Sequence, residues 1–490
     1  MFLRPAAYEQ QDIAYERMIF KKYFALFPDL GVGKTYMLLR EFLAMWQAGY
    51  VDGLLVVAPV DVHDQWITTE LPKTTDQECI TAVWPEPPPL QKTKLPRIFT
   101  IYPEAFRRRP KPPPREKNES NAAFRARRAL WRSRQKNALK HMERFLKSGR
   151  MGFVVDESQM MMHHDSRTTK TLRLLRELGA YRRISSGYPV PGGRLELAYP
   201  QYTWLSPKIL RCATFGDFKS RYCVSGGFKG KEIEGYINED DYKARVAPYT
   251  YTVEIEDCTD MPERTWLEFP VELTKQQKDF IKQIKEEFVA ELNKKTLYMP
   301  MVLQRLTRIQ QVACGFLPYD ANEDAEGKPD IRLQWIPELR TEALERMLAR
   351  TRGRVIVWSR FSPCIERLTK HFGSEAVKYR GGMTKEEKAA AKEEFINGKA
   401  RLIFAQPKSA GTGTDGFQKN CRYTFYWSNS YDSQQRRQTE RRIWRLGQNR
   451  ACVYGDFIAP GTYDAKIRSV IMNGQKLSDS LHRELAAWKI

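Results

Sequence analysis

Residues 31–35 have the sequence Gly-Val-Gly-Lys-Thr, between an apolar run, Phe24–Phe27, and a helical pattern, Tyr36–Trp46. A turn of small residues that joins a strand to a helix directs its backbone N–H groups at phosphate oxygens. In such a turn Lys34 meets the β- and γ-phosphates, and the hydroxyl of Thr35 is a ligand for Mg²⁺. The segment therefore predicts a strand, a phosphate-binding loop and a helix. The loop residues are Gly31, Val32, Gly33, Lys34 and Thr35.

A pair of carboxylates, Asp156 and Glu157, ends a second apolar run, Phe153–Val155. An aspartate at the tip of a strand completes a metal shell, and a neighbouring glutamate orients or deprotonates an attacking water. Acidic pairs at strand ends are also common on surfaces, so neither segment is decisive alone. Together, and in this order, they predict that the chain binds and hydrolyses a nucleoside triphosphate, with Mg²⁺ held by Thr35 and Asp156.

The charge of the chain indicates its partner. The 81 Lys and Arg residues outnumber the 59 Asp and Glu residues and leave a net charge of +22. This excess is larger than solubility requires and is typical of proteins that bind a polyanion. Nucleic acid is the expected polyanion, because no amphipathic anchor or lipidation signal points to a membrane.

Other bounds come from what the sequence lacks. Its longest apolar stretches, such as Leu54–Ala58, have the length of a strand and not of a membrane span. The segment Met1–Pro5 has no charged and apolar blocks of a secretory signal, so we expect a cytoplasmic protein, or a nuclear one in a eukaryote. Eight scattered cysteines without a Cys-x-x-Cys pair argue against disulfides and a zinc site.

Short apolar runs alternate with helical patterns in two parts of the chain, before about residue 205 and after about residue 335. This alternation predicts parallel sheets covered by helices on both faces. We therefore expect an α/β protein with two lobes, residues 1–205 and 335–490, joined by a helical connector, residues 206–334. The main runs are Leu54–Val57, Arg97–Ile101, Phe153–Val155, Val355–Trp358, Leu402–Phe404 and Tyr423–Trp427.

Three further segments are distinctive. An insertion at about residues 107–137 has four prolines, and its part Arg107–Lys136 holds twelve basic residues against two acidic ones. It is interpreted either as a solvated loop or as a basic arm that touches phosphates. In the connector, Thr274–Leu292 has the pattern of an amphipathic helix, and Asp320–Pro329 that of an acidic surface loop.

The segment Gln438–Gln448 carries arginines near the end of the chain. On a helix, the spacing of Gln438, Arg442 and Arg445 places them on one face. A solvated basic helix is one interpretation. The other is that Arg442 and Arg445 are arginine fingers, which the second lobe brings to the γ-phosphate of a nucleotide.

In this arrangement the sequence resembles superfamily-two helicases, and among them the Swi/Snf-type DNA translocases. The resemblance spans nearly the whole chain and includes the order of the motifs. Besides the segments above, it rests on Tyr8–Ala14, Val56–Pro59 with Gln65-Trp66, Thr100–Tyr102, Asp156–Gln159, Ser185–Pro189, Leu273–Gln277, Val355–Phe361, Tyr379–Thr384, Ser409–Asp415 and Gln438–Gln448.

The resemblance implies two RecA-like, doubly wound lobes that bind ATP and Mg²⁺ in the cleft between them. It assigns adenine recognition to Gln11, with Gln10 as the weaker alternative, and further nucleotide contacts to Gly413 and Asp415. It gives catalytic roles to Lys34, Asp156, Glu157, Gln438, Arg442 and Arg445. The implied nucleic-acid contacts are Pro59, Gln65, Thr100, Ser185, Ser186, Ser409 and Thr412.

The sequence departs from the family pattern at several positions, none of which removes a ligand of phosphate, metal or water. We therefore expect an active ATPase. The departures are Pro28 in place of a small residue, Gln159 in place of histidine, Ser185 and Tyr188 in place of threonines, and Arg441 and Trp444 in place of glycine and histidine.

The resemblance thus predicts a compact, bacterial or bacteriophage type of ATP-dependent translocase that moves along double-stranded DNA as a monomer. Two alternatives stay open. One is an RNA helicase; the other is a DNA-binding adaptor that uses ATP as a switch, without motor activity. Single-stranded DNA or RNA also stays open as the partner in place of double-stranded DNA.

Overall fold

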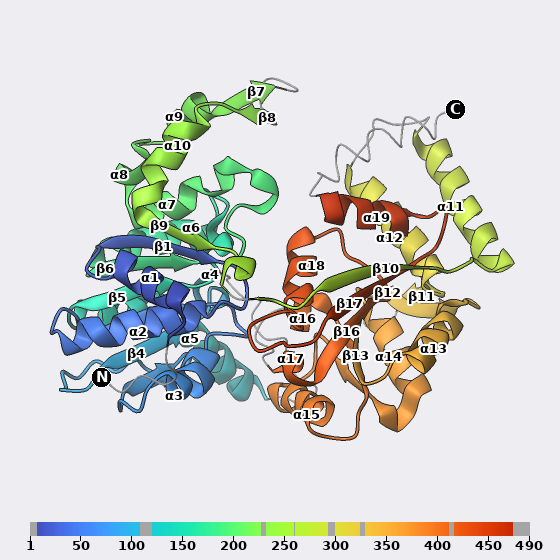
Figure 1. Cartoon of the computed structure of the whole chain (residues 1–490), viewed down its shortest axis with the longest axis horizontal. Helices are drawn as coiled ribbons and strands as arrows, with labels where there is room; N and C mark the ends of the chain where they lie inside the picture. Colours follow the sequence, from blue (N-terminus) through green and yellow to red (C-terminus); the bar gives the residue numbers. More distant parts are fainter. Residues whose placement is uncertain are drawn as a thin grey trace. The chain divides into compact units, whose positions relative to one another are not determined.

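The computed structural model describes residues 7–107, 120–226, 232–258, 260–292, 299–323, 329–410 and 416–473. The chain divides into two compact units, Met1–Asp260 and Met261–Ile490. Residues 206–260 of the expected connector fall within the first unit, and residues 261–334 within the second. Each unit is built around one parallel sheet (Figure 1).

The sheet of the first unit has seven strands in the order β3-β4-β2-β5-β6-β1-β9, and every neighbouring pair is parallel. Its strands are β1 (Tyr23–Pro28), β2 (Gly53–Val57), β3 (Ile80–Val83), β4 (Arg97–Ile101), β5 (Met151–Val155), β6 (Tyr181–Ser185) and β9 (Thr250–Val253). The strands expected at Leu54–Val57, Arg97–Ile101 and Phe153–Val155 are present.

The central strands of this sheet are buried on both faces. In β1, Ala25 and Phe27 join one core together with Leu55 of β2, while Phe24 and Leu26 are buried on the other face. Strands of this kind need a helical layer on each side. The helices of this unit that bear on the site are α1 (Glu9–Met18), α2 (Lys34–Gln47), α4 (Glu104–Arg107), α5 (Asn121–Lys147), α6 (Arg167–Leu175) and α7 (Tyr199–Leu205).

One strand of the sheet is polar and is buried through an ion pair. Arg183 of β6 and Glu41 of α2 are both 0% exposed, and the Arg183 Nε donates to Glu41 Oε2 over 2.9 Å. The guanidinium also donates to the carbonyls of Met18 and Lys21. Because its guanidinium nitrogens donate to a carboxylate and to backbone carbonyls, this arginine can be buried in the sheet at a position where an apolar residue is usual.

The rest of the first unit closes its sheet. After α8 (Pro207–Leu210) and α9 (Phe215–Tyr222), a hairpin of β7 (Cys223–Gly226) and β8 (Glu232–Tyr236) and helix α10 (Glu239–Val246) precede β9. Strand β9 pairs with β1, and the Asp29 N–H donates to the Val253 carbonyl over 2.9 Å. The chain therefore leaves this unit beside the strand that carries the glycine-rich loop.

The sheet of the second unit has six parallel strands in the order β10-β17-β16-β13-β15-β14. Its strands are β10 (Arg264–Pro270), β13 (Arg354–Trp358), β14 (Ala376–Tyr379), β15 (Leu402–Ala405), β16 (Cys421–Tyr426) and β17 (Cys452–Ile458). The three expected runs of this part all form strands. The predicted fold class, α/β with two parallel-sheet units, is confirmed.

The helices of the second unit are α11 (Lys275–Leu292), α12 (Met299–Ala313), α13 (Arg340–Arg350), α14 (Ser362–Phe372), α15 (Lys385–Ile396), α16 (Pro407–Ala410), α17 (Phe417–Asn420), α18 (Ser433–Glu440) and α19 (Tyr463–Asn473). The expected amphipathic helix corresponds to α11, and its Ile281 and Ile284 pack with Ile309 of α12. The two ends of the surface loop expected at Asp320–Pro329 belong to the strands of an antiparallel hairpin, β11 (Phe316–Glu323) and β12 (Pro329–Trp335), and residues 324–328 lie outside the described residues.

The described end of the proline-rich insertion is a helix and not a loop. Residues 108–119 lie outside the described residues, but helix α5 begins at Asn121, directly after Ser120, whose Oγ accepts from the Ala123 N–H over 3.1 Å. The prolines at 110–114 precede this N-cap, so they do not interrupt the helix. Within the described parts of the chain, no helix is both long and apolar enough to cross a membrane.

Candidate nucleotide and nucleic-acid sites

Three segments of the first unit meet at one edge of its sheet. Strands β5, β6 and β1 are neighbours and run parallel, so the residues that follow them lie side by side. Residues 29–35 follow β1, Asp156 and Glu157 follow β5, and residues 186–188 follow β6. The carboxyl edge of a parallel sheet is where ligands bind in proteins of this class.

The glycine-rich loop has the geometry that a phosphate cradle needs. Gly31 and Gly33 have φ angles of 93° and 92°, which favour glycine, and helix α2 begins at Lys34. The first N–H groups of α2 therefore face the loop without helical partners. Pro28, which departs from the family pattern, is the last residue of β1 and leaves this loop intact.

Gln11 lies on the loop, as expected for a residue next to the nucleotide. It is 5% exposed, and its Nε2 donates to the Val32 carbonyl over 3.0 Å. A Cβ atom at Gly33 would stand 2.6 Å from this Nε2, so the glycine leaves room for the amide. Gln10, the weaker alternative, is also buried, but no contact of its side chain with the loop is found among the described residues.

The catalytic candidates Lys34 and Glu157 lie next to each other. The Lys34 Nζ is 3.7 Å from the Glu157 Oε1, and both side chains are largely buried. Gln159 Nε2 donates to Glu157 Oε2 over 2.6 Å, and Ser186 Oγ donates to Gln159 Oε1 over the same distance. A chain of hydrogen bonds therefore runs from the end of β6 to the carboxylate. Gln159, the departure from the family's histidine, is its central member.

Asp156 is enclosed by donors. Trp66 Nε1 donates to its Oδ2 over 3.1 Å, and Ser185 Oγ donates to its Oδ1 over 2.6 Å. Burial, followed by the negative charge of Glu157, raises the pKa of Asp156 against the opposing effects of Lys34 and of these hydrogen bonds. A buried carboxylate beside a second one favours a cation, so the donor set fits a divalent metal ion shared with the Thr35 hydroxyl at the start of α2.

Sequence reasoning missed the role of Trp66 here. A buried indole N–H needs a partner inside the protein, but the burial of Trp66, which is 1% exposed, is set by the fold and was not visible in the sequence.

Gly187, in the loop after β6, lies close to the glycine-rich loop. A Cβ atom there would lie 2.4 Å from Leu30 Cδ2 and 3.0 Å from Lys34 Nζ. We expect Gly187→Ala to weaken ATP binding by about 5- to 150-fold, because overpacking of this size costs about 1–3 kcal/mol and displaces Lys34. Titration with a fluorescent ATP analogue measures this change.

The matched control is Gly216→Ala in α9, where a Cβ atom meets no heavy atom closer than 3.5 Å. An ATP affinity of Gly187→Ala equal to that of Gly216→Ala would contradict the expectation.

In the second unit, the expected helical face of Gln438, Arg442 and Arg445 is not formed. Helix α18 ends at Glu440, so Gln438 is helical while both arginines lie in the turn that follows. The turn is held by the Gln448 side chain, whose Nε2 donates to the Ile443 carbonyl over 3.1 Å and to the Cys421 carbonyl over 2.9 Å. These contacts fold the chain back toward β16 and prevent the helix from continuing.

Trp444 fixes the same turn from the other side. It is 2% exposed, and its Nε1 donates to the Pro262 carbonyl over 2.6 Å. The guanidinium carbons of Arg264 and Arg441 lie 3.8 Å and 4.3 Å from its ring centroid. The two unusual residues of this motif, Arg441 and Trp444, therefore stack together and tie the turn to the start of β10.

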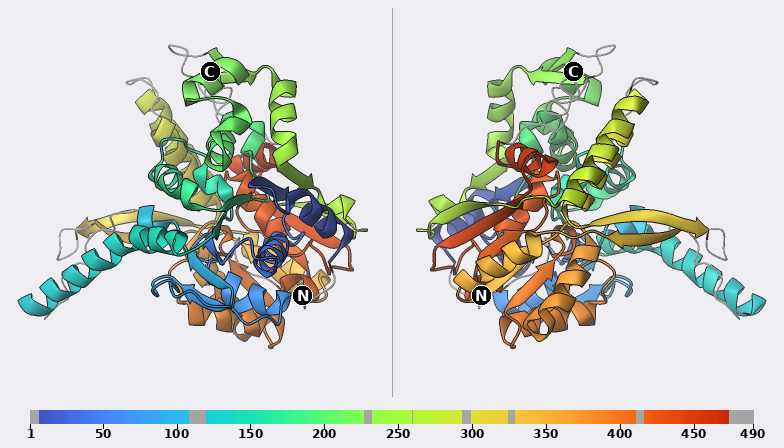
Figure 2. Two further views of the ribbon diagram at one scale, coloured as in Figure 1. Left: turned by 90° about the vertical axis from the view of Figure 1, so that its left-hand side faces the viewer. Right: turned by 90° about the vertical axis from the view of Figure 1, so that its right-hand side faces the viewer.

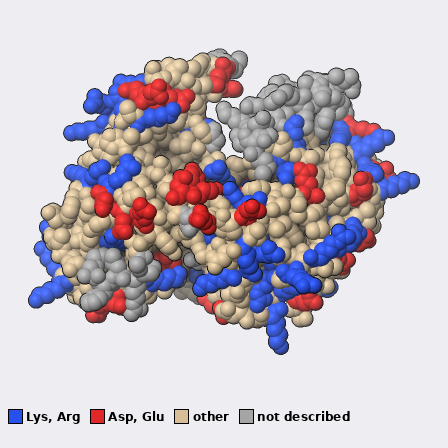
Figure 3. All heavy atoms as spheres, viewed as in Figure 1, with Lys and Arg blue, Asp and Glu red and all other residues tan. Residues whose placement is uncertain are grey.

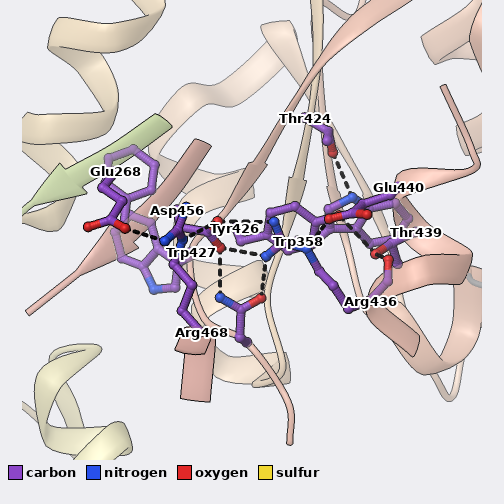
Figure 4. A network of polar contacts seen from close by, with 12 residues as sticks. Glu268, Trp358, Thr424, Tyr426, Trp427, Arg436, Thr439, Glu440, Asp456 and Arg468 are labelled. Atoms are coloured by element: carbon purple, nitrogen blue, oxygen red, sulfur yellow. Dashed lines mark hydrogen bonds and ion pairs between the residues drawn. The ribbon is translucent and has the colours of Figure 1, made fainter. Parts of the chain in front are cut away.

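Helix α18 itself is anchored by a buried polar network (Figure 4). The Arg436 Nη1 donates to Asp456 Oδ1 over 2.5 Å, its Nε donates to Glu440 Oε1 over 2.7 Å, and its guanidinium stacks on Tyr426. Burial opposes the ionisation of Asp456, but the Arg436 charge and hydrogen bonds outweigh it and lower the pKa of Asp456. The network fixes where the following arginine turn begins.

The predicted nucleic-acid contacts divide into two groups. Pro59 and Gln65 are half-buried near the carboxyl end of β2, and Gln65 Nε2 donates to the Asp61 carbonyl over 2.6 Å. Thr100, Ser185 and Ser186 are 0% exposed. The structure therefore directs Ser185 to Asp156 and Ser186 to the Gln159 amide, and it places Thr100 inside the sheet.

The remaining predicted contacts belong to the second unit. Ser409 is 9% exposed, and its Oγ is 3.5 Å from Gln406 Oε1. Thr412, Gly413 and Asp415 lie outside the described residues.

A polar pocket of about 460 Å³ opens at the carboxyl ends of β13, β15 and β16. The cations of its lining, Arg360 and Lys408, lie shortly after β13 and β15. Arg360 Nη1 donates to Gln310 Oε1 over 3.1 Å, which fixes the position of its guanidinium. The lining residues are Arg360, Gln406, Pro407, Lys408, Ser430, Tyr431, Asp432 and Gln435.

No protein-family model matches the chain, and no curated protein matches it. Among solved structures, the chain is similar to the SWI2/SNF2 ATPase core of Sulfolobus solfataricus in complex with double-stranded DNA. That match has 16% identity and a TM-score of 0.38, and it covers 96% of this chain and 92% of the other.

The SWI2/SNF2 ATPase core domain of the same organism matches with 17% identity and a TM-score of 0.40, over 96% of this chain and 89% of the other. Both are ATPase cores of the type that the motifs resemble.

Proposed function

We propose that the protein is an ATPase that is stimulated by double-stranded DNA and moves along it. The observation that carries the proposal is the meeting of Lys34, Glu157 and Asp156 at the carboxyl edge of one parallel sheet, with the Lys34 Nζ 3.7 Å from the Glu157 Oε1. A cation for phosphate, a carboxylate for water and a buried carboxylate for a metal are the groups that hydrolysis of a triphosphate needs.

Each residue has a role in this proposal. Lys34 and the N–H groups at the start of α2 bind the β- and γ-phosphates. Glu157, held by Gln159, orients a water molecule and accepts its proton. Thr35 and Asp156 would hold Mg²⁺, which when bound neutralises charge on the phosphate oxygens. Arg442 and Arg445 stabilise the charge that develops on the transferred phosphoryl group.

Two observations support nucleic acid as the partner. The net charge is +22, and Figure 3 shows groups of Lys and Arg side chains distributed over the face that it draws, between smaller clusters of Asp and Glu. The pocket with Arg360 and Lys408 also lies at the carboxyl edge of its sheet, where it fits a backbone phosphate. Contacts of this kind imply little sequence preference and a steep loss of binding with salt.

The hydrogen bonds from Ser186 through Gln159 to Glu157 provide a physical link between the catalytic carboxylate and the loop after β6. In the proposed cycle, the conformation of this loop changes with the state of the bound nucleotide, and this change alters the affinity of the protein for DNA. Repeated cycles then move the protein along the duplex.

The test is phosphate release by the wild type and by Lys34→Ala with duplex DNA, single-stranded DNA, single-stranded RNA and duplex RNA. We expect duplex DNA to stimulate the wild type most. We expect Lys34→Ala to lose about 10²- to 10³-fold in rate, because a positioned cation at the phosphates is removed.

Displacement of a third strand from a triplex provides the readout for movement. Stronger stimulation by RNA would replace the proposal with an RNA helicase. ATP-dependent DNA affinity without displacement would replace it with an ATP-switched adaptor. Full ATPase activity of Lys34→Ala would contradict the ATP site itself.

A further inference from the structure

Helix α5 has two halves of different character. In its second half Ala138, Met142 and Phe145 are 0% exposed and belong to the core of the first unit. In its first half, none of the described side chains at residues 121–129 is buried. At 1.5 Å per residue, roughly 25 Å of helix separates Asn121 from Ala138, the first residue of α5 whose side chain is described as buried. Figure 2 shows this helix projecting from the body of its own unit.

The projecting half is strongly basic. No acidic residue occurs from Asn121 to Met142, whereas lysine and arginine occupy positions 125, 127, 128, 132, 134, 136 and 140. The spacing of 125, 128, 132, 136 and 140 follows one side of a helix. Among the described side chains, Arg125 and Lys140 on this stripe are exposed. The anchoring residues, spaced 138, 142 and 145, occupy a different side.

A solvated charged face is the simpler explanation, but this stripe does not have the composition of one. Exposed helices usually alternate the signs of their charges, because like charges three or four residues apart repel each other and destabilise the helix. Here the anchored end holds the helix in place, and an external polyanion would relieve the repulsion between the like charges of the stripe. Phe124 supports two of the cations, with Arg127 and Arg128 at 5.9 Å and 5.5 Å from its ring centroid.

We propose that the projecting half of α5 is a second nucleic-acid contact that binds duplex DNA along its phosphate backbone. The inference rests on the proposed function for its choice of partner and adds a contact outside the motifs. A helix of about 10–12 Å diameter fits the major groove of B-form DNA, about 12 Å wide. The groove of A-form RNA is too narrow for it. Small side chains keep this part of the helix narrow enough for the groove, with alanine at positions 122, 123, 126 and 129.

The test compares two triple variants that each lose three positive charges. One carries Arg125→Gln, Arg128→Gln and Lys140→Gln on the stripe of α5. The control carries Arg350→Gln, Arg352→Gln and Lys370→Gln, which are exposed near the amino ends of β13 and β14. The dissociation constant for a short DNA duplex is measured without nucleotide at 50 and 200 mM salt.

The salt slope is the steepness with which the logarithm of the DNA affinity falls with the logarithm of the salt concentration. If three phosphate contacts are lost, this slope falls by about 2.7. The ratio of the affinity at 50 mM salt to that at 200 mM salt is then roughly 40-fold smaller than in the wild type. The control keeps the slope of the wild type. Equal slopes for the two triple variants would overturn the inference. Duplex RNA or an acidic peptide that competes with duplex DNA as strongly as unlabelled duplex DNA itself would overturn the choice of partner.

The ATPase rate without nucleic acid stays unchanged in the α5 variant, which shows that the first unit is folded. The same binding comparison in a Lys34→Ala background separates this inference from the proposed function. A protein without ATPase activity still shows the slope change if α5 binds DNA, whereas an active ATPase without the slope change refutes only the role of α5.

Discussion

Glu157→Gln is expected to slow ATP hydrolysis by about 10²- to 10⁴-fold, which is the usual contribution of a general base. The substitution keeps the size of the side chain and an oxygen that accepts the hydrogen bond from Gln159 Nε2, now 2.6 Å long. It removes the carboxylate that would take a proton from water. Because the negative charge 3.7 Å from Lys34 also disappears, ATP should bind at least as tightly as in the wild type.

The measurement combines phosphate release at saturating ATP with nucleotide affinity, both with duplex DNA present. Asp165→Asn is the control, because it removes one exposed acidic charge from the same connection between β5 and α6. A rate for Glu157→Gln close to that of Asp165→Asn would mean that another group activates the water.

Arg442→Ala is expected to lower the rate of hydrolysis by about 10³- to 10⁵-fold, the range found for arginine fingers. Arg442 lies in the turn after α18, which is fixed by the Gln448 amide and by Trp444. A guanidinium on a fixed turn loses little freedom when it meets a phosphate, and its charge acts mainly on the transition state. ATP binding should therefore change little. Arg445→Ala, measured separately, shows how the two arginines share this role.

Arg442→Lys distinguishes a planar, bidentate contact from a simple charge, because lysine restores the charge without the fork of donors. Arg450→Ala serves as the control for loss of a nearby exposed arginine. If Arg442→Ala and Arg445→Ala both hydrolyse ATP as fast as Arg450→Ala, the second unit supplies no finger from this turn.

Much of the architecture was predictable, because it follows from apolar runs that end in chemically distinctive residues. The strands before Gly31 and before Asp156 are buried on both faces, and such strands are visible in a sequence. Strand β6 was not visible, since Arg182 and Arg183 interrupt its apolar pattern. Arg183 is buried only because it pairs with Glu41, 142 residues earlier in the chain, and periodicity contains no information on such a pair.

The candidate site shows the same limit. Lys34 and Glu157 were predicted from their motifs, and the structure brings them together. The buried state of Ser186 and its contact with Gln159 depend on the order of strands in the sheet, which local patterns do not specify. The prediction from helical spacing that Arg442 lies on a helix was also wrong. Contacts of Gln448 with distant carbonyls end α18 two residues before Arg442.

The connection between the two units begins and ends on functional elements. Val253 accepts from the N–H of Asp29, just before the glycine-rich loop, and Pro262 accepts from Trp444 in the arginine turn. Each end of this connection is therefore held by a hydrogen bond within its own unit, to the residue before the glycine-rich loop at one end and to the arginine turn at the other. A substitution beside Val253 or Pro262 is thus expected to disturb a candidate site residue's neighbours without touching the site itself.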